Sequence, residues 1–430
     1  MSSIPVSVPR EPGGARRWLD HELARLATER PGIDRLLRAT WRRPVPFVVV
    51  LSVLMEGFLG AAIVDGDADW FRHAGVAMIG PGFLDVFSDS GLQIGPIYLA
   101  GIGLAARLFA ALGLPVVFML SATQAAGVAW LATWTAGRAA RITGTAQLPA
   151  QWAVGLTLAL GGFLAEGVGN GHPEEILLGL LLANAALSAG RGRFAVAGVL
   201  IGLATGIKQW GIIGAGVLLT GRRLRGVVVG SATLAAVVLS VYLPFALGGQ
   251  VKTLDMAWGI PRGSMLGLIG GWVHGSDWTL RAIQGALAGA VGAAVSLRRR
   301  GSPLVAVALA ISARLFLDPL RLSYYSGPLV AVVLLWLWTS DDRVLRRLRL
   351  PVTAAMPLLV LGPYVSPAWF FWPAGNVVLV VAPVALLVLD GMAARRRTAE
   401  PVGGATGERI ATNLPPCPTP SVPSPVPASS

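Results

Sequence analysis

Blocks of apolar residues alternate with short polar stretches along most of the chain. Segments such as 44–64, 226–247 and 374–390 contain almost no charged residues. A helix of about 20 apolar residues is long enough to cross the roughly 30 Å hydrocarbon core of a bilayer. The pattern therefore predicts an all-α fold, a polytopic bundle of transmembrane helices.

We distinguish about thirteen apolar segments of this kind. They are 44–64, 94–112, 115–137, 149–168, 176–189, 194–206, 209–220, 226–247, 281–297, 303–316, 324–339, 351–366 and 374–390. Both ends of the chain are predicted on the same side of the membrane, so the number of full crossings must be even. We expect 94–112 to be the exception, as a re-entrant or partly inserted helix.

Arginines fall in short runs between the apolar blocks, at 138–141, 191–193, 222–225, 298–300, 343–349 and 395–397. The net charge of +13 would suggest nucleic-acid binding in a soluble protein, but only 13% of the residues are charged and 54% are hydrophobic. Positive-inside orientation explains the runs better, because alternating helices bring them all to one side. We assign that side to the cytoplasm and expect no nucleic-acid partner.

Three regions follow from this pattern. Residues 1–43 form an Arg-rich cytoplasmic segment with an amphipathic stretch at 18–37. Residues 44–390 form the transmembrane domain, with an outer first loop at 65–93 and a second outer loop at 248–280, and residues 391–430 form a disordered Pro-rich cytoplasmic tail. Lys208 and Lys252 are the only lysines, which indicates a GC-rich bacterial genome and hence a bacterial plasma membrane. The single cysteine, Cys417, excludes an intrachain disulfide and a cysteine-based metal site.

Most carboxylates and histidines between the two terminal regions fall on the opposite, outer side. Asp67 and Asp69 follow the first apolar segment directly, and His172, Glu174 and Glu175 lie together between two later segments. A charge near hydrocarbon costs a few kcal/mol, so such groups usually face a cavity or a partner. The sequence therefore predicts a polar site at the outer face, although acids in loops can also be merely solvated.

Three cations, Lys208, Arg262 and Arg321, also fall on the outer side, where positive-inside statistics disfavour them. Arg binds phosphate through two parallel hydrogen bonds, and Lys acts as a point charge. These side chains suit a phosphate group; the alternative is local ion pairing, above all of Arg321 with Asp318. One histidine beside glutamates lacks the HExxH spacing of a metal-binding helix, so neither a divalent metal nor another cofactor is indicated.

The order of these motifs resembles the GT-C superfamily of membrane glycosyltransferases, and within it the actinobacterial polyprenol-phosphate-mannose-dependent mannosyltransferases. The likeness covers residues 44–390. In that family an Asp in the first outer loop, four residues before an aromatic, is the expected catalytic base, and Asp67 with Phe71 has this spacing. The family's Tyr-Pro-Pro is represented only by Gly95-Pro96, and its Gly-Gln-Xaa-Asn is replaced by residues 171–174. Its Ser-Pro-Xaa-Ser-Trp-Xaa-His-His is matched by residues 318–325, where Tyr324 and Tyr325 replace the two histidines.

The resemblance implies transfer of a sugar, mannose or another hexose or pentose, from a polyprenyl-phosphate donor to a glycolipid, glycan or protein acceptor of the cell envelope. Asp67 would be the general base, with Asp69 as the second candidate. The lipid phosphate would be held by Lys208, Arg262 and Arg321. The sugar or acceptor pocket would be lined by His172, Glu174, Glu175, Tyr324 and Tyr325.

Two other functions stay open. A secondary transporter also holds rare charged groups in a helical bundle, but it usually shows two-fold internal repeats with broken helices near the midplane, and we find no convincing repeat. A non-catalytic protein of envelope assembly would tolerate the loss of Asp67, Lys208 and Arg321. The sequence contains no P-loop motif, so no soluble nucleotide-binding domain is expected.

Overall fold

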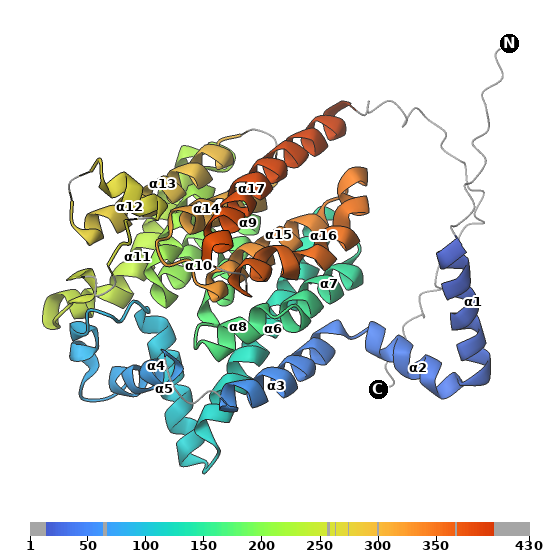
Figure 1. The fold of residues 1–430 in the computed structure, drawn as a ribbon, viewed down its shortest axis with the longest axis horizontal. Coiled ribbons are helices and arrows are strands. Elements are labelled where there is room, and N and C mark those ends of the chain that lie inside the picture. The colour runs from blue at the N-terminus through green and yellow to red at the C-terminus, as the bar shows by residue number, and fades with distance from the viewer. Residues whose placement is uncertain are drawn as a thin grey trace, which may run out of the picture.

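Helices account for all the regular secondary structure of the part of the chain that the computed structural model describes, residues 14–62, 67–255, 259–262, 264–273, 275–298, 301–365 and 368–399. Figure 1 shows their arrangement. The α-helices are α1 (Gly14–Glu29), α2 (Pro31–Trp41), α3 (Pro44–Ala62), α4 (Asp67–Met78), α5 (Pro96–Ala111), α6 (Val116–Thr143), α7 (Gln147–Leu160), α8 (Phe163–Gly169), α9 (Glu174–Gly190), α10 (Phe194–Ile207), α11 (Leu224–Gly248), α12 (Met265–Gly270), α13 (Asp277–Ser296), α14 (Pro303–Leu317), α15 (Gly327–Thr339), α16 (Arg343–Leu361) and α17 (Ala368–Ala399). Short 3-10 helices are η1 (Phe83–Ser88), η2 (Gln209–Leu219), η3 (Thr253–Asp255), η4 (Ser323–Ser326) and η5 (Gly362–Val365).

Four of the described helical stretches are long and apolar enough to cross a membrane: Val116–Thr143, Leu224–Gly248, Arg343–Val365 and Pro373–Arg396. The pair α7 and α8 makes a fifth candidate, with a bend of 47° between its halves. The chain is therefore an all-α membrane protein, as the apolar pattern predicts. The GT-C-like arrangement and the number of crossings stay predictions, because many of the predicted segments form helices shorter than a span.

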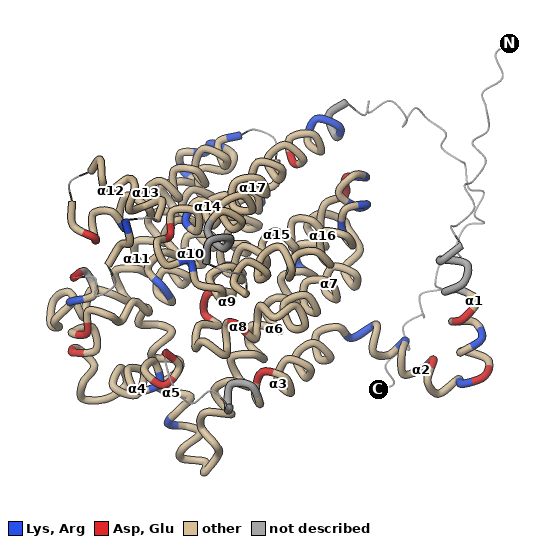
Figure 2. Tube along the Cα trace, in the orientation of Figure 1, with Lys and Arg blue, Asp and Glu red and all other residues tan. Residues whose placement is uncertain are grey.

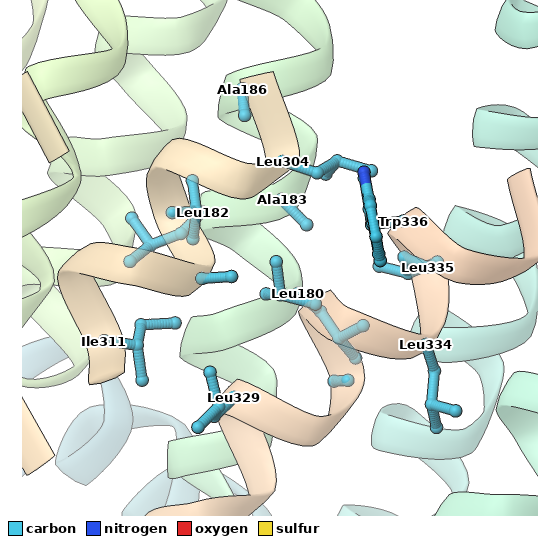
Figure 3. Close-up of a cluster of buried hydrophobic side chains, with 14 of the residues drawn as sticks. Leu180, Leu182, Ala183, Ala186, Leu304, Ile311, Leu329, Leu334, Leu335 and Trp336 are labelled. Atoms are coloured by element: carbon cyan, nitrogen blue, oxygen red, sulfur yellow. The ribbon is translucent and has the colours of Figure 1, made fainter. Parts of the chain in front are cut away.

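The core lies where α9, α14 and α15 meet (Figure 3). A helix that is apolar on all sides is normally buried on all sides. Leu180 and Leu182 of α9 are completely buried, as are Ile311 of α14 and Leu334 of α15. Because α9 is enclosed in this way, the position of its N-terminal end is fixed by the packing of the whole bundle.

A hairpin of α4 and α5 takes the place of the predicted outer loop 65–93 and the apolar segment 94–112. Its two helices touch through glycines, since a Cβ on Gly103 would lie 1.9 Å from the carbonyl oxygen of Gly75. Small residues at such a crossing let two backbones approach closely. The helix α5 is shorter than the candidate spans, as are several other apolar helices. The incomplete crossing of 94–112 stays a prediction.

The amphipathic stretch predicted at 18–37 forms α1 and α2, which lie apart from the bundle in Figure 1. On α2 the apolar side chains of Leu36, Leu37 and Trp41 are largely exposed. Trp152 Nε1 donates to the Trp41 carbonyl oxygen at 2.9 Å and so ties the end of α2 to α7.

At the other end of the chain α17 continues through Ala399, past the boundary predicted at residue 390. Residues 400–430, which include most of the predicted tail, lie outside the described residues.

Arginine-rich loops that are far apart in the sequence meet at one end of the bundle. Arg222 Nη2 donates to the Leu297 carbonyl oxygen at 2.8 Å, which joins the start of α11 to the end of α13. Arg396 Nη1 lies 3.2 Å from an Asp342 carboxylate oxygen, which joins the end of α17 to the start of α16.

The helix α9 runs from an acidic group of residues to this arginine-rich end. Glu174 is its first residue, and Ser188, near its last turn, accepts a hydrogen bond of 2.9 Å from Arg138. A helix rises 1.5 Å per residue, so these two positions are roughly 21 Å apart along the axis. Figure 2 shows acidic residues at the start of α9 and basic residues at the far end of α17. The assignment of the two ends to the cell exterior and the cytoplasm stays a prediction.

Candidate functional site

The first residue of α4 and the loop before α9 lie against each other. Gly171 adopts a left-handed backbone (φ +79°), and a Cβ there would lie 2.5 Å from the Ala68 amide nitrogen. Only glycine allows both the conformation and the approach. The next residue, His172, places its Nε2 atom 2.9 Å from the Oδ2 atom of Asp67. Asp67 and the residues around Glu174 therefore belong to one site.

His172 is held between two carboxylates. Its Nδ1 atom lies 2.7 Å from Glu174 Oε1, so both ring nitrogens face a carboxylate oxygen. Both nitrogens are donors only in the imidazolium form. Burial lowers the pKa of this imidazole, but the charge of Glu174 and the hydrogen bonds to Asp67 and Glu174 outweigh it, and the pKa lies above its usual value.

Lys208 joins the same chain of charges from the opposite side. Its Nζ atom lies 3.1 Å from Glu174 Oε1 and 2.5 Å from Glu175 Oε1. All three side chains are buried, so the ammonium group and the two carboxylates neutralise one another away from water. The unbroken sequence of contacts is Asp67, His172, Glu174, Lys208 and Glu175.

A break in the helical structure presents Lys208 to this cluster. The residue is extended (φ −155°, ψ 133°) between the end of α10 and the 3-10 helix η2. Gly95 supports the break, because its amide donates to the Ile207 carbonyl oxygen at 2.7 Å. A Cβ on Gly95 would lie 2.2 Å from the Gly206 carbonyl oxygen. The end of α10, just before Lys208, is thus packed against Gly95 at the start of α5.

Aromatic rings cover the charged cluster. The His172 ring stacks on Tyr324, with 4.2 Å between ring centroids and an interplanar angle of 10°. Tyr324 meets Tyr325 edge to face, and Lys208 Nζ lies 5.4 Å from the Tyr325 ring centroid. The Arg314 guanidinium packs on the same Tyr325 ring, 4.7 Å from its centroid, and on the Trp210 ring, 4.4 Å from its centroid.

A second group of charges surrounds Asp318. Arg314 and Arg281 approach its carboxylate oxygens at 3.4 Å and 3.7 Å, and Gln284 Nε2 lies 3.5 Å from Oδ2. Within the described part of the chain, Arg314 Nη1 and Arg281 Nε are buried without a hydrogen-bond partner. A buried donor without a partner lowers the stability of the protein, so a ligand that supplies an acceptor for these atoms would be bound favourably.

Both groups line one cavity of about 660 Å³. Its charged lining includes Asp67, His172 and Lys208 together with Arg281 and Arg314. Another part of the lining is apolar. It consists of Ala282, Gly285, Ala286 and Gly289 of α13 with Ile212 and Ile213 of η2. The cavity therefore combines a carboxylate, several cations and an apolar groove.

The structure brings most of the predicted site residues together. Asp67, His172, Lys208, Tyr324 and Tyr325 line the cavity. Glu174 and Glu175 lie directly behind it, bound to His172 and Lys208.

Three predicted residues lie elsewhere. Asp69 pairs with Arg72, whose hydrogen bond keeps the pKa of that carboxyl below its usual value, and it does not line the cavity. Arg262 is exposed in the loop before α12 and does not line the cavity either. Arg321 donates to Asn376 and, at 3.4 Å, to the Phe316 carbonyl oxygen. Its backbone amide, and not its guanidinium, contacts the Asp318 carboxylate, at 3.4 Å.

Arg281, Gln284 and Arg314 were not among the predicted residues. The sequence did contain a signal for Arg314, because it is a single charge inside the apolar segment 303–316. Arg281 stands at the first position of the segment 281–297 and gives a weaker signal. Within the described residues, no group of three His, Cys, Asp or Glu side chains is arranged to hold a metal ion. No family model, curated protein or solved structure gives a significant match to this chain.

Proposed function

We propose that this protein is a membrane glycosyltransferase that moves a sugar from a polyprenyl-phosphate carrier to an acceptor of the cell envelope, at the outer face of the bacterial plasma membrane. One observation carries the proposal: the Asp67 carboxylate and the Arg281 and Arg314 guanidinium groups line the same cavity. Sugar transfer from a lipid phosphate needs a proton acceptor at one end of the reacting bonds and cations at the other.

Asp67 is the general base in this proposal. Its side chain is 43% exposed, so an acceptor hydroxyl can reach it, while the contact with His172 fixes its orientation. The acceptor oxygen attacks the anomeric carbon as Asp67 takes its proton. The bond from that carbon to the phosphate oxygen breaks, and the electron pair leaves with the lipid phosphate.

Arg281 and Arg314 hold the departing phosphate. Lys208, the first candidate from the sequence, already binds two carboxylates, so it has less capacity to bind a third anion. Arg314 has a buried donor with no partner in the ranges that the structure describes, and a guanidinium matches the geometry of phosphate oxygens. The cradle thus contains residues from α13 and α14 in place of Arg262 and Arg321.

The apolar wall suits the prenyl chain of the donor. A Cβ on Gly285 would meet no atom within 4 Å, so the surface of α13 is open there. The charged part of the cavity and the small residues of α13 are continuous. A lipid phosphate can therefore bind with its head beside Arg281 and its chain along α13. The acceptor then approaches from the Asp67 side.

The test compares Asp67→Asn with Asp69→Asn, the same change at a carboxylate outside the cavity. Release of polyprenyl phosphate from a polyprenyl-phosphate-mannose donor is measured with the purified proteins and an envelope lipid extract as acceptor. General base catalysis contributes about 10²- to 10⁴-fold, so Asp67→Asn should lose that factor and Asp69→Asn should stay within about threefold.

Equal elution profiles and unfolding midpoints for both variants establish that each is folded. Full transfer by Asp67→Asn removes this residue from the role of base. Equal losses in the two variants would instead show that the cavity does not define the active site.

A further inference from the structure

A second hollow lies at the arginine-rich end of the bundle, away from the cavity of the proposed active site. It is a groove of about 520 Å³ between the end of α13 and the last turns of α17. We call it the Arg298–Arg395 groove. Its lining residues are Arg298, Leu387, Val388, Gly391, Met392, Ala394 and Arg395. Both charged members are arginines, and no carboxylate lines it in the described ranges.

Asp390, which precedes Gly391 on α17, does not line the groove. Its carboxylate accepts a hydrogen bond of 3.1 Å from the Ser302 amide and one of 3.4 Å from Trp336 Nε1. These bonds fasten α17 to the beginning of α14. The next residue, Gly391, lets Arg298 lie on the helix, because a Cβ there would be 3.1 Å from its Nη2 atom.

An apolar strip on α17 leads into the groove. Val377, Val381, Val384 and Val388 are each more than half exposed. They recur every three or four residues, so they lie along one face of the helix. Since α17 contains one of the candidate spans, this face is available to lipid chains. An amphiphile could therefore lay its chain along the valines and its head between the two arginines.

We propose that the Arg298–Arg395 groove binds one anionic phospholipid of the cytoplasmic leaflet. The groove joins two positive side chains to an apolar strip, and basic pockets between membrane helices attract acidic head groups. A zwitterionic lipid would gain no comparable net attraction. The site is separate from sugar transfer and does not depend on it.

The proposal is tested by native mass spectrometry of the detergent-purified full chain, titrated with phosphatidylglycerol or phosphatidylcholine. We expect one phosphatidylglycerol to bind in preference to phosphatidylcholine. The double change Arg298→Gln with Arg395→Gln should weaken phosphatidylglycerol binding by roughly thirtyfold, because each basic residue near an anionic head group contributes about 1 kcal/mol and each 1.4 kcal/mol is a tenfold step in affinity. Arg347→Gln removes an exposed arginine of α16 at the same end, outside the groove, and should leave binding unchanged.

A double change to lysine at the same two positions keeps the charge and should retain affinity within about fivefold. Retained binding by the lysine variant shows that the loss in the glutamine variant comes from the missing charge and not from misfolding after substitution at these positions. Equal binding of the two lipids, or an equal loss in Arg347→Gln, would overturn the proposal. Displacement of the lipid by millimolar inorganic phosphate would also overturn it, because it would show a site for free anions.

Discussion

Arginines at the two ends of the bundle are used in opposite ways. Arg222, at the arginine-rich end, is exposed and donates from Nε and Nη2 to one helix-terminal carbonyl, that of Leu297. Arg314, at the other end, is buried beneath aromatic rings beside Asp318, and its Nη1 atom has no hydrogen-bond partner among the described residues. The first arrangement completes a helix end. The second leaves a buried donor that, in the proposed function, binds the phosphate of the donor lipid. Burial and hydrogen bonding, and not charge alone, distinguish the two arginines.

The carboxylates show the same contrast. Asp342, at the arginine-rich end, caps α16 by accepting from the Val344 and Leu345 amides. Glu174 and Glu175 are completely buried, and each keeps its Oε2 atom without a hydrogen-bond partner in the described part of the chain. Charges in such a position cost stability unless a partner compensates them. The buried cluster is thus where substitution should have the largest effect.

Lys208→Ala is expected to have the largest effect on stability. It leaves Glu174 and Glu175 buried without their shared cation, and breaking a buried ion pair costs about 3–5 kcal/mol. Unfolding of the purified protein in detergent, followed by intrinsic fluorescence during a denaturant or thermal ramp, measures the loss. Lys252→Ala is the matched control, because Lys252 is an exposed lysine outside the cluster.

Lys208→Met combined with Glu175→Gln should recover part of the stability, because it removes a positive and a negative charge together. If Lys208→Ala has the same unfolding midpoint as Lys252→Ala, Lys208 does not compensate the buried charges of Glu174 and Glu175. The buried cluster would then contribute no more to stability than the exposed charges at the arginine-rich end.

The sequence predicted the helices of the bundle better than their place in it. Residues 44–62 of the first apolar segment form α3, and 176–189 lies within α9, because long apolar runs leave little choice of structure. The lengths of the apolar segments in the sequence did not show which of the resulting helices are long enough to cross a membrane. The helices α14 and α15 are short and buried on nearly all sides, and periodicity cannot distinguish a lipid-facing from a protein-facing apolar surface.

The candidate site was predictable where sequence neighbours share it. His172, Glu174 and Glu175 lie within four residues, and Lys208 interrupts an apolar run, so both features stand out. The pairing of His172 with Asp67 spans 105 positions and depends on how α4 docks against Gly171. Arg262 and Arg321 fall outside the cavity because the paths of their loops are set by tertiary contacts that no local pattern encodes.

Arg314→Gln, compared with Arg222→Gln, tests the two arginine environments directly. A hydrogen bond to a charged group contributes about 1.5–3 kcal/mol, so Arg314→Gln should raise KM for the lipid-linked donor by roughly 10- to 100-fold. Arg222→Gln removes an exposed contact and should change the same KM by less than about threefold. Steady-state donor titrations of both variants give the comparison.

Arg314→Lys keeps the charge without the planar fork and should give an intermediate KM. An equal rise of KM in Arg314→Gln and Arg222→Gln would show that the donor responds to net charge alone, and it would remove Arg314 from the phosphate cradle.

The smallest expected effect is a pH dependence of stability that comes from His172. Its folded-state pKa is raised above the unfolded value of about 6.5, because the charge of Glu174 and the hydrogen bonds to Asp67 and Glu174 outweigh burial. The stabilisation is therefore complete below about pH 6.5 and is lost as the pH rises through the folded-state pKa. His172→Gln should flatten that decline in unfolding free energy above about pH 6.5, compared with His73→Gln, which alters an exposed histidine of α4. Parallel pH profiles for the two variants would mean that the imidazolium contributes no stability, and that neutral His172 bonds to only one of its two carboxylates.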